Sequence, residues 1–563
     1  MMLRFYKLFL LTGLLCLGNL SAADEVLDAG VVVPKIVPSE EPVSEKPKAH
    51  QVIGQLAGVK LKQVWPILKE IEKMLGAEGL PLFQAIIESR LYYQRVDKKI
   101  VIIRKQNNGM YRLFDPVSLE EIGEKKKSSL KKVRSNNRIR KNLRVTISRL
   151  RLLSPDVEVR KVSIHNMLGN LDHDTIRLLE KISLDEQHQS VLELIDLALA
   201  LYYFQNSDQQ IVRLSALELM SSSLEPLVRN LINDVLKTDS AGRYIEQDSR
   251  VVRKALSIKK AIDAKVRFYE ILEKIFFGLS LGSVLLLAAI GLAITFGVMG
   301  VINMTHGEMI MLGAYTTYVI QLVLPNYIEY SVLIAIPAAF LVSGLVGIII
   351  QRSVIRFLHG RPLETLLATF GISLILQQTV RSIFSPLNRQ VESPQWLSGS
   401  MEFNAVFSIT YNRLYILIFA LIVFFVLQLI LKKTSLGLHV RAVSQNRDMA
   451  KSMGIRTEWV DALTFGLGSG IAGIAGVALS QLTNVGPNLG QAYIIDSFMV
   501  VVFGGVGNLW GTLVGGFTLG LSNKFLEPLT GAVLANILVL VFIILFIQKR
   551  PRGLFPQKGR AAE

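Results

Sequence analysis

Four polar side chains lie close together inside an apolar stretch, Gly291–Tyr315. They are Asn303, Thr305, His306 and Glu308, and glycines flank them. A bilayer penalises an ionised or unpaired polar group, so such side chains face a protein interior or a water-filled route. Glycines let a membrane helix break where its backbone lines a cavity. The stretch predicts a translocation path, or its gate, built on a discontinuous helix. The alternative is an ordinary cytoplasmic turn between two spans.

A second apolar segment, 494–520, is also interrupted by glycines, around Asn508. Two such interruptions, one in each half of a membrane domain, indicate a binding path between structural repeats. Gln377 and Gln378 lie in the apolar segment 363–384 and add amide groups to the same candidate path. Their alternative role is to satisfy each other or the backbone between helices.

The elements that must position these residues form a polytopic membrane domain. The 563 residues are half hydrophobic, and the charged residues are concentrated in the first half. Apolar segments long enough to cross a bilayer are expected at 275–297, 299–322, 329–350, 363–384, 413–431, 462–483, 494–520 and 532–548. The predicted fold class is an all-α polytopic membrane protein of about 8–9 spans with broken or re-entrant segments, plus a mainly α-helical, HEAT-like N-terminal domain.

The first half of the chain divides into three expected parts. Arg4 and Lys7, a short apolar run and small residues predict a signal peptide at 1–23. A linker rich in proline and charge follows at 24–50. Residues 51–265 are expected to form a mostly helical domain, with a hairpin turning at an Asn-Gly pair near residue 108.

Three further features bear on that domain and its partners. Related patterns around Arg160, Arg213 and Arg253 suggest stacked helix pairs of the HEAT type. The basic run 125–151 has no interleaved aromatic residues to stack on bases, which favours a solvated helix face, or contact with anionic membrane lipid or a partner, over nucleic acid. The one cysteine, Cys16, lies in the signal segment, so no cysteine framework, metal site or cofactor is expected.

The distribution of basic residues predicts the topology. With the N-terminal domain extracytoplasmic, Arg352 and Lys432 follow spans that end inside, as the positive-inside rule requires. The membrane domain at 270–550 then ends in a basic tail, 551–563, that is expected in the cytoplasm. A break within 494–520 reconciles this orientation with the number of crossings. The expected location is a bacterial inner (plasma) membrane.

The loop Gly437–Gly454 is polar, basic and expected in the cytoplasm. The chain has no GxxxxGK[ST] phosphate loop, so a transporter of this kind would receive its force from a separate ATPase through such an element. The alternative is a plain amphipathic connector. The candidate coupling residues are Arg441, Asn446, Asp448, Ala450 and Gly454.

Five ordered motifs carry a family resemblance: NMTHGEMIMLGAY, RPLETLLATFGISLILQ, RAVSQNRDMAKSMGI, FGLGSGIAGIAGVALSQ and VVVFGGVGNLWGTLVGG. Across about residues 270–555 the chain resembles the branched-chain amino-acid permease family of ABC importers. Within that family, GLAITFGVMGVINMTHGE and the segment that begins RPLETLLATFG are most similar to the urea-transporter permease subgroup. The signal segment and the long N-terminal domain also look like that subgroup.

The resemblance implies a transport subunit and not an enzyme. It implies as partners two ABC ATPase subunits, a second homologous permease subunit and an extracytoplasmic solute-binding receptor. The Asp448–Gly454 stretch looks like the family's coupling motif, which implies a docking role, but Asp448 stands where Glu is usual and Met449 where Ala is usual. Thr305 stands where the family more often has Ala.

Urea presents two NH2 donors and one carbonyl acceptor, and the candidate path offers matching acceptors and donors without a required fixed charge. The leading hypothesis is therefore an importer permease for urea or a short amide. A branched-chain amino-acid permease is the alternative within transport. A membrane-anchored sensor or scaffold is the alternative of another class. An intramembrane hydrolase has little support, because His306 and Glu308 lack a matching serine or metal cluster.

Overall fold

The computed structural model describes residues 46–105, 110–358 and 360–556. The expected signal peptide, most of the linker 24–50, the hairpin turn near residue 108 and the end of the basic tail lie outside these residues. Helix α2 (Lys46–Gly54) begins inside the range assigned to the linker, so the end of that range is helical. The chain divides into two compact units, residues 1–198 and 199–563, and each is described by itself.

The first unit opens with helices beside a small antiparallel sheet. Helices α3 (Leu61–Leu75) and α4 (Leu80–Ile87) precede strands β1 (Leu91–Gln94), β2 (Ile100–Lys105), β3 (Met110–Phe114), β4 (Glu121–Lys126) and β5 (Leu130–Lys132). The sheet order is β4-β3-β2-β1-β5. Ile103 of β2 lies opposite Leu113 of β3, which confirms the predicted hairpin. The other three strands were not predicted from the sequence.

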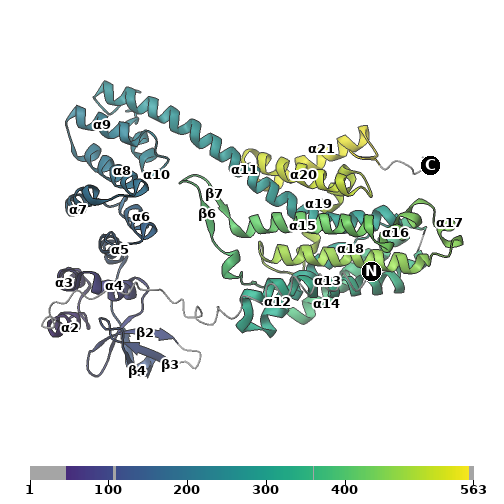
Figure 1. The fold of residues 1–563 in the computed structure, drawn as a ribbon, viewed down its shortest axis with the longest axis horizontal. Helices are drawn as coiled ribbons and strands as arrows, with labels where there is room; N and C mark the ends of the chain where they lie inside the picture. Colours follow the sequence, from purple (N-terminus) through teal and green to yellow (C-terminus); the bar gives the residue numbers. More distant parts are fainter. Residues whose placement is uncertain (1–45, 106–109, 359, 557–563) are drawn as a thin grey trace. The chain divides into compact units, whose positions relative to one another are not determined.

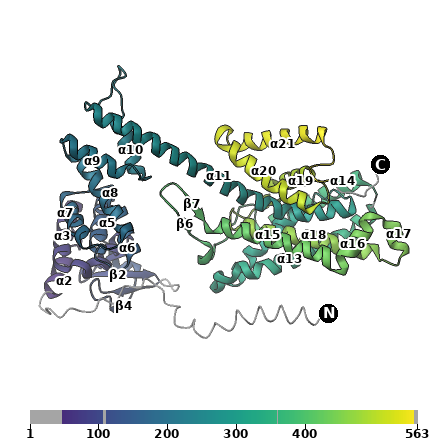
Figure 2. The same ribbon diagram turned by 45° about the horizontal axis from the view of Figure 1, so that its top comes forward.

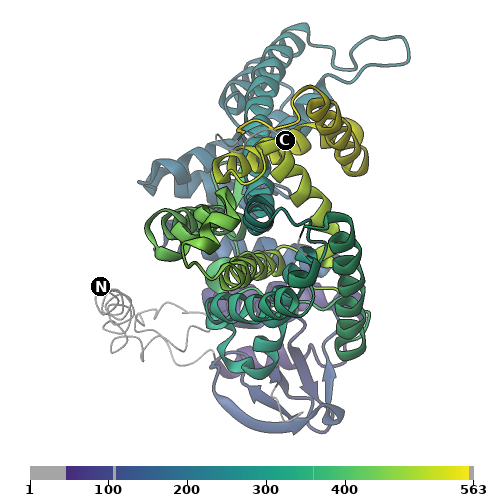
Figure 3. The ribbon, with the colours of Figure 1, turned by 90° about the vertical axis from the view of Figure 1, so that its right-hand side faces the viewer.

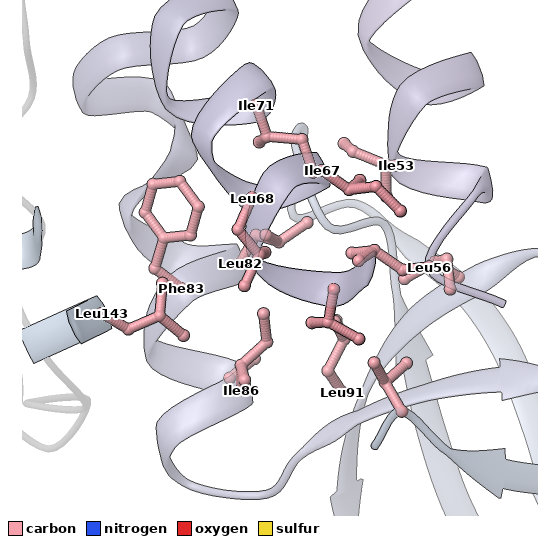
Figure 4. Close-up of a cluster of buried hydrophobic side chains, with 14 of the residues drawn as sticks. Ile53, Leu56, Ile67, Leu68, Ile71, Leu82, Phe83, Ile86, Leu91 and Leu143 are labelled. Carbon is pink, nitrogen blue, oxygen red and sulfur yellow. The ribbon is translucent and has the colours of Figure 1, made fainter. Parts of the chain in front are cut away.

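The core of this unit joins α2, α3, α4 and the sheet to helix α5 (Asn137–Arg151). Figure 4 shows Ile53, Leu68, Phe83 and Leu143 gathered around its centre. These side chains are almost fully buried, so they are removed from water as a single apolar cluster.

Helix α5 explains much of the basic run 125–151. Its residues Ile139 and Leu143 enter the core, whereas Arg138, Lys141 and Arg144 recur every three residues and are exposed. Residues at this spacing share one face of a helix. These residues are therefore exposed on one face of α5, as a solvated face or a surface for anionic lipid or a partner requires.

Short helices follow: α6 (Val157–Met167), α7 (His173–Asp185), α8 (Gln189–Asn206), which contains the division between the units, α9 (Gln210–Met220) and α10 (Pro226–Val235). Two of the repeated arginines form comparable ion pairs, Arg160 with Glu186 and Arg213 with Glu246. The HEAT-type relation remains a prediction.

Helix α11 (Ser249–Met299) runs without interruption for 51 residues. Its first part buries Val251, Ala255 and Ile258 and packs against α9 and α10. Its last part is strongly apolar and carries the first candidate span. Figure 1 shows it as one long teal helix. The span predicted at 275–297 is therefore the end of a longer helix.

The remaining helices of the second unit are α12 (His306–Val323), α13 (Ile328–Ser353), α14 (Pro362–Phe384), α15 (Tyr411–Lys433), α16 (Ser435–Gln445), α17 (Arg447–Ser452), α18 (Thr457–Ser480), α19 (Leu489–Gly504), α20 (Leu509–Thr530) and α21 (Ala532–Lys549). A short hairpin, β6 (Ser400–Glu402) and β7 (Ser408–Thr410), lies beside α11 (Figure 2), where Phe407 stacks on Tyr269.

Six described helices are long and apolar enough to cross a membrane: α11, α13, α14, α15, α18 and α21. The predicted number of 8–9 spans is not confirmed by this measure. The span predicted at 299–322 is wrong at its start, because residues 300–305 are not helical. The segment 494–520 is interrupted as predicted, between α19 and α20. Helix α19 is apolar but shorter than the six.

Close helix contacts rest on glycine. A Cβ atom added at Gly313 of α12 would lie 1.9 Å from the carbonyl oxygen of Gly473 in α18, and one at Gly490 of α19 would lie 1.9 Å from that of Gly307. Such approaches are typical of membrane helices, which gain little hydrophobic driving force from one another. Figure 3 shows several of these helices nearly end-on and side by side.

Candidate functional site

The predicted helix break is present between α11 and α12. Gly300 ends α11 in the left-handed conformation, with φ of 67°, and α12 begins six residues later at His306. The His306 Nε2–H group donates to the carbonyl oxygen of Ala288, 2.8 Å away. Ala288 lies 11 residues before the end of α11, which corresponds to about 16 Å along a helix. The chain therefore turns back, and α12 begins beside the middle of the apolar part of α11.

Residues 300–305 are held by polar contacts in a buried environment. The Asn303 Oδ1 atom accepts from the backbone N–H of Thr305, at 3.0 Å, and from its hydroxyl. The backbone N–H of Met304 donates to the hydroxyl of Thr369 on α14, at 3.2 Å. Asn303 and Thr305 are fully buried. The alternative of an ordinary exposed turn does not fit this burial.

Glu308 binds α14 and not His306. Its Oε1 atom accepts from the Ser373 hydroxyl at 2.9 Å and from the Gln377 amide at 2.7 Å. The carboxylate is 1% exposed, and its Oε2 atom has no partner among the described residues. One oxygen therefore fixes α12 to α14, and the other remains available.

Three buried polar atoms at the break lack partners within the described part of the chain: Asn303 Nδ2, His306 Nδ1 and Glu308 Oε2. Buried polar groups are normally paired, and exceptions need a physical explanation. Asn303 Nδ2 is a donor and Glu308 Oε2 an acceptor. In the neutral imidazole, His306 Nδ1 is an acceptor, because Nε2 carries the proton that makes the hydrogen bond to the Ala288 carbonyl oxygen. A neutral solute with N–H and C=O groups could satisfy both kinds.

The structure does not bring every candidate path residue to this cluster. Gln378 is exposed on α14, whereas Gln377 is buried against Glu308. Asn508 caps α20 instead. Its Oδ1 atom accepts from the backbone N–H groups of Trp510 and Gly511, and its amide donates to Phe555 at 3.3 Å. The second glycine break is thus held by the segment after α21.

Ser373 and Thr369 contact the residues of the break but were not among the predicted site residues. They belong to a stripe of buried polar residues on α14, which consists of Thr365, Thr369, Ser373 and Gln377. Every fourth position of an α-helix lies on one face. That spacing, inside an apolar segment, was the signal that could have identified them.

The candidate coupling residues form a compact helical loop. The Asn446 Oδ1 atom caps α17 by accepting from the backbone N–H of Met449 at 2.9 Å, and Gly454 ends the helix with φ of 83°. Arg441 donates to the carbonyl of Leu431 at the end of α15. Ala450 is buried, whereas Asp448 is exposed.

This loop is connected to the first helix break. Val440, Val443 and Ala450 share an apolar cluster with Val298, two residues before Gly300. Met449 and Met453 point away from this cluster and are 63% and 78% exposed. A displacement of α16 and α17 would therefore reach the end of α11 through direct side-chain contact.

No group of three or more His, Asp or Glu side chains that could hold a metal ion occurs in the part of the chain that the structure describes. The site consists of amide, carboxylate, imidazole and hydroxyl groups.

Comparison with known proteins covers the second half of the chain. Residues 274–548 match the family described as branched-chain amino acid transport system / permease component. The high-affinity branched-chain amino acid transport system permease protein BraD of Pseudomonas aeruginosa is 30% identical over 297 residues, which are 51% of this chain and 96% of that protein. Its counterpart LivH of Escherichia coli is 29% identical over 299 residues, with the same coverage.

A more distant relative has a different solute in its name. The ribose import permease protein RbsC of Haemophilus influenzae is 25% identical over 255 residues, which are 44% of this chain and 75% of that protein. No solved structure matches the chain significantly.

Proposed function

Because the chain belongs to the branched-chain amino-acid permease family, we propose that it moves urea, or a related short amide, inward as the membrane subunit of an ATP-driven importer. The observation that carries the solute assignment is the buried helix break, with its unpaired donor on Asn303 and unpaired acceptor on Glu308. Urea offers a carbonyl to the first and an NH2 group to the second. A branched-chain amino acid, the solute in the names of BraD and LivH, is the second candidate.

The two solutes place different demands on the path. An amino acid carries a carboxylate, which transporters often meet with helix N-termini or cations. At this break the N-terminus of α12 is buried, but its first turn already carries the Glu308 carboxylate, which is bound to α14, and the His306 imidazole donates to a carbonyl. This environment favours a neutral solute.

Uptake of radiolabelled solute tests the assignment. The complete transporter, reconstituted with its ATPase and receptor partners, should accumulate urea in an ATP-dependent manner. Leucine accumulation without urea accumulation would replace the leading solute by the second candidate. If neither urea nor leucine accumulates when ATP is supplied, the result would favour the alternative of a sensor or scaffold.

The proposed partners are two ABC ATPase subunits, a second homologous permease subunit and an extracytoplasmic solute-binding receptor. In this arrangement the loop of α16 and α17 receives the ATPase on its exposed methionines. Its buried side passes the movement to Val298 and hence to the break. The solute route opens and closes as the contacts between α12 and α14 are made and released.

Changing the exposed surface of α17 should uncouple the transporter. Replacing Met449 and Met453 by Asp places charges where an apolar contact is expected, so ATP-driven uptake should fall at least about tenfold while ATP hydrolysis continues. The measurement is the ratio of solute moved to ATP hydrolysed. Leu438→Asp, exposed in the same loop, is the matched control and should affect the ratio less.

We further propose that residues before α11 are extracytoplasmic and that the basic tail is cytoplasmic, in agreement with the positive charge after α13 and α15. A periplasmic reporter fused near residue 200 should be active, and a cytoplasmic reporter there inactive. The reverse pattern would invert the topology and remove the coupling role of α17.

A further inference from the structure

A second set of polar groups lies on the exposed surfaces of α14 and α19. The Arg381 guanidinium on α14 donates to the Asn488 side-chain oxygen, 2.7 Å away, and Asn488 directly precedes α19. This hydrogen bond joins the two helices beside the start of α12.

Two glutamines lie at the depth of the helix break. Gln378 follows Gln377, which binds Glu308 at the start of α12. Gln491 follows Gly490, whose backbone packs against Gly307 one residue away from Glu308. Both glutamines are exposed, and the described structure gives neither side chain a hydrogen bond.

An acidic side chain continues this set on α19. Asp496 lies between Ile494, which would contact a Cβ atom at Gly307, and Phe498, whose ring centroid is 6.0 Å from that of Phe296. It is therefore at a depth between the break and the end of α11. Asp496 is half-buried, next to the 60%-exposed Ile495, and has no hydrogen bond or ion pair within the described residues.

Lipid does not suit the polar residues of this surface. Unpaired amides and a carboxylate at membrane depth face protein or water, not hydrocarbon. The exposed positions of α15 and α21 show the contrast, because they are residues such as Phe425, Leu429, Phe542 and Leu545. On α14 and α19 apolar residues such as Ile375 are exposed too, so the contrast lies in the polar residues set among them at the depth of the helix break.

We infer that Gln378, Gln491 and Asp496 border the water-filled solute route, and that Asp496 is a second acceptor along it for N–H groups of the passing solute. An ionised carboxylate only accepts hydrogen bonds, so this position favours solutes that carry N–H donors. The inference rests on the proposed function for the presence of a route, but its first test does not depend on the solute.

Water access can be measured with single cysteines, because Cys16 is the one cysteine of the chain. In the complete transporter with Cys16→Ser, a charged, membrane-impermeant methanethiosulfonate reagent is applied during ATP turnover. Gln491→Cys and Gln378→Cys should react at least about tenfold faster than Phe425→Cys on α15, because the reagent needs water. Equal, slow reaction at all three positions would overturn the inference.

The role of Asp496 has its own test. Asp496→Asn keeps the size and should leave assembly with the ATPase intact but lower uptake at least about tenfold. Normal uptake by this variant would remove Asp496 from the route. If the cysteines react as expected but the transporter carries leucine and not urea, the proposed solute fails and the assigned face stands.

Discussion

Replacing Gly313 by valine should prevent the membrane helices from assembling. The added Cβ atom would lie 1.9 Å from the carbonyl oxygen of Gly473 and 2.6 Å from its Cα atom. Backbone atoms cannot rotate away as a side chain can, so α12 and α18 would have to separate. Ordinary overpacking costs about 1–3 kcal/mol, and a backbone collision should exceed that. The measurement is the yield of monodisperse protein after mild detergent extraction.

Gly371→Val is the matched control for this change. Gly371 also lies inside an apolar helix, α14, but a Cβ atom there meets nothing within 4 Å. Its yield should stay close to that of the parent chain. Equal yields for both variants would show that α12 and α18 are not packed as described.

Glu308→Gln should abolish most solute uptake while the protein still assembles. Glutamine has nearly the same size, and its one carbonyl oxygen can replace Oε1 as the acceptor for Ser373 and Gln377. Its NH2 group, a donor, then stands where Oε2 offers an acceptor to the solute. Leaving a buried polar group unsatisfied costs about 1–3 kcal/mol, which corresponds to a roughly 5- to 150-fold loss of uptake. Uptake and assembly with the partner subunits should be measured in one preparation.

Two further variants complete this experiment. Glu364→Gln changes an exposed carboxylate on the same helix as Gln377, where its partner Arg361 is also exposed, and should leave uptake near normal. Asn303→Ala removes the unpaired donor and should lower uptake in the same direction as Glu308→Gln. Full uptake in both Glu308→Gln and Asn303→Ala would mean that the helix break does not serve transport.

The sequence was sufficient to predict the helix break because its signals are local. Glycine next to polar residues in an apolar segment is visible without any knowledge of tertiary structure, and the break at Gly300 is present. The hairpin between β2 and β3 was predictable for the same reason. The caps at Asn446 and Asn508 also follow from nearby residues, although the second was assigned to the path.

The partners of the site residues depend on tertiary packing and could not be obtained in this way. The sequence placed Gln377 and Gln378 together, but one turns toward Glu308 and the other away from it. His306 and Glu308 were considered as a pair, yet each contacts a different helix. The small sheet was mostly missed because β4 and β5 are rich in lysine and lack the alternating apolar pattern of a half-buried strand.

The uninterrupted course of α11 has a consequence for its rotational phase. The part of α11 held by α9 and α10 and the part that ends at the break belong to one helix without a hinge. Each residue of an α-helix turns the chain by about 100°. One residue inserted between 267 and 275 would therefore turn one end against the other by about 100°, whereas seven residues would restore the facing to within about 20°. The direction in which Asn303 faces therefore depends on the rotation of α11 that its contacts with α9 and α10 set, and not only on the length of the helix.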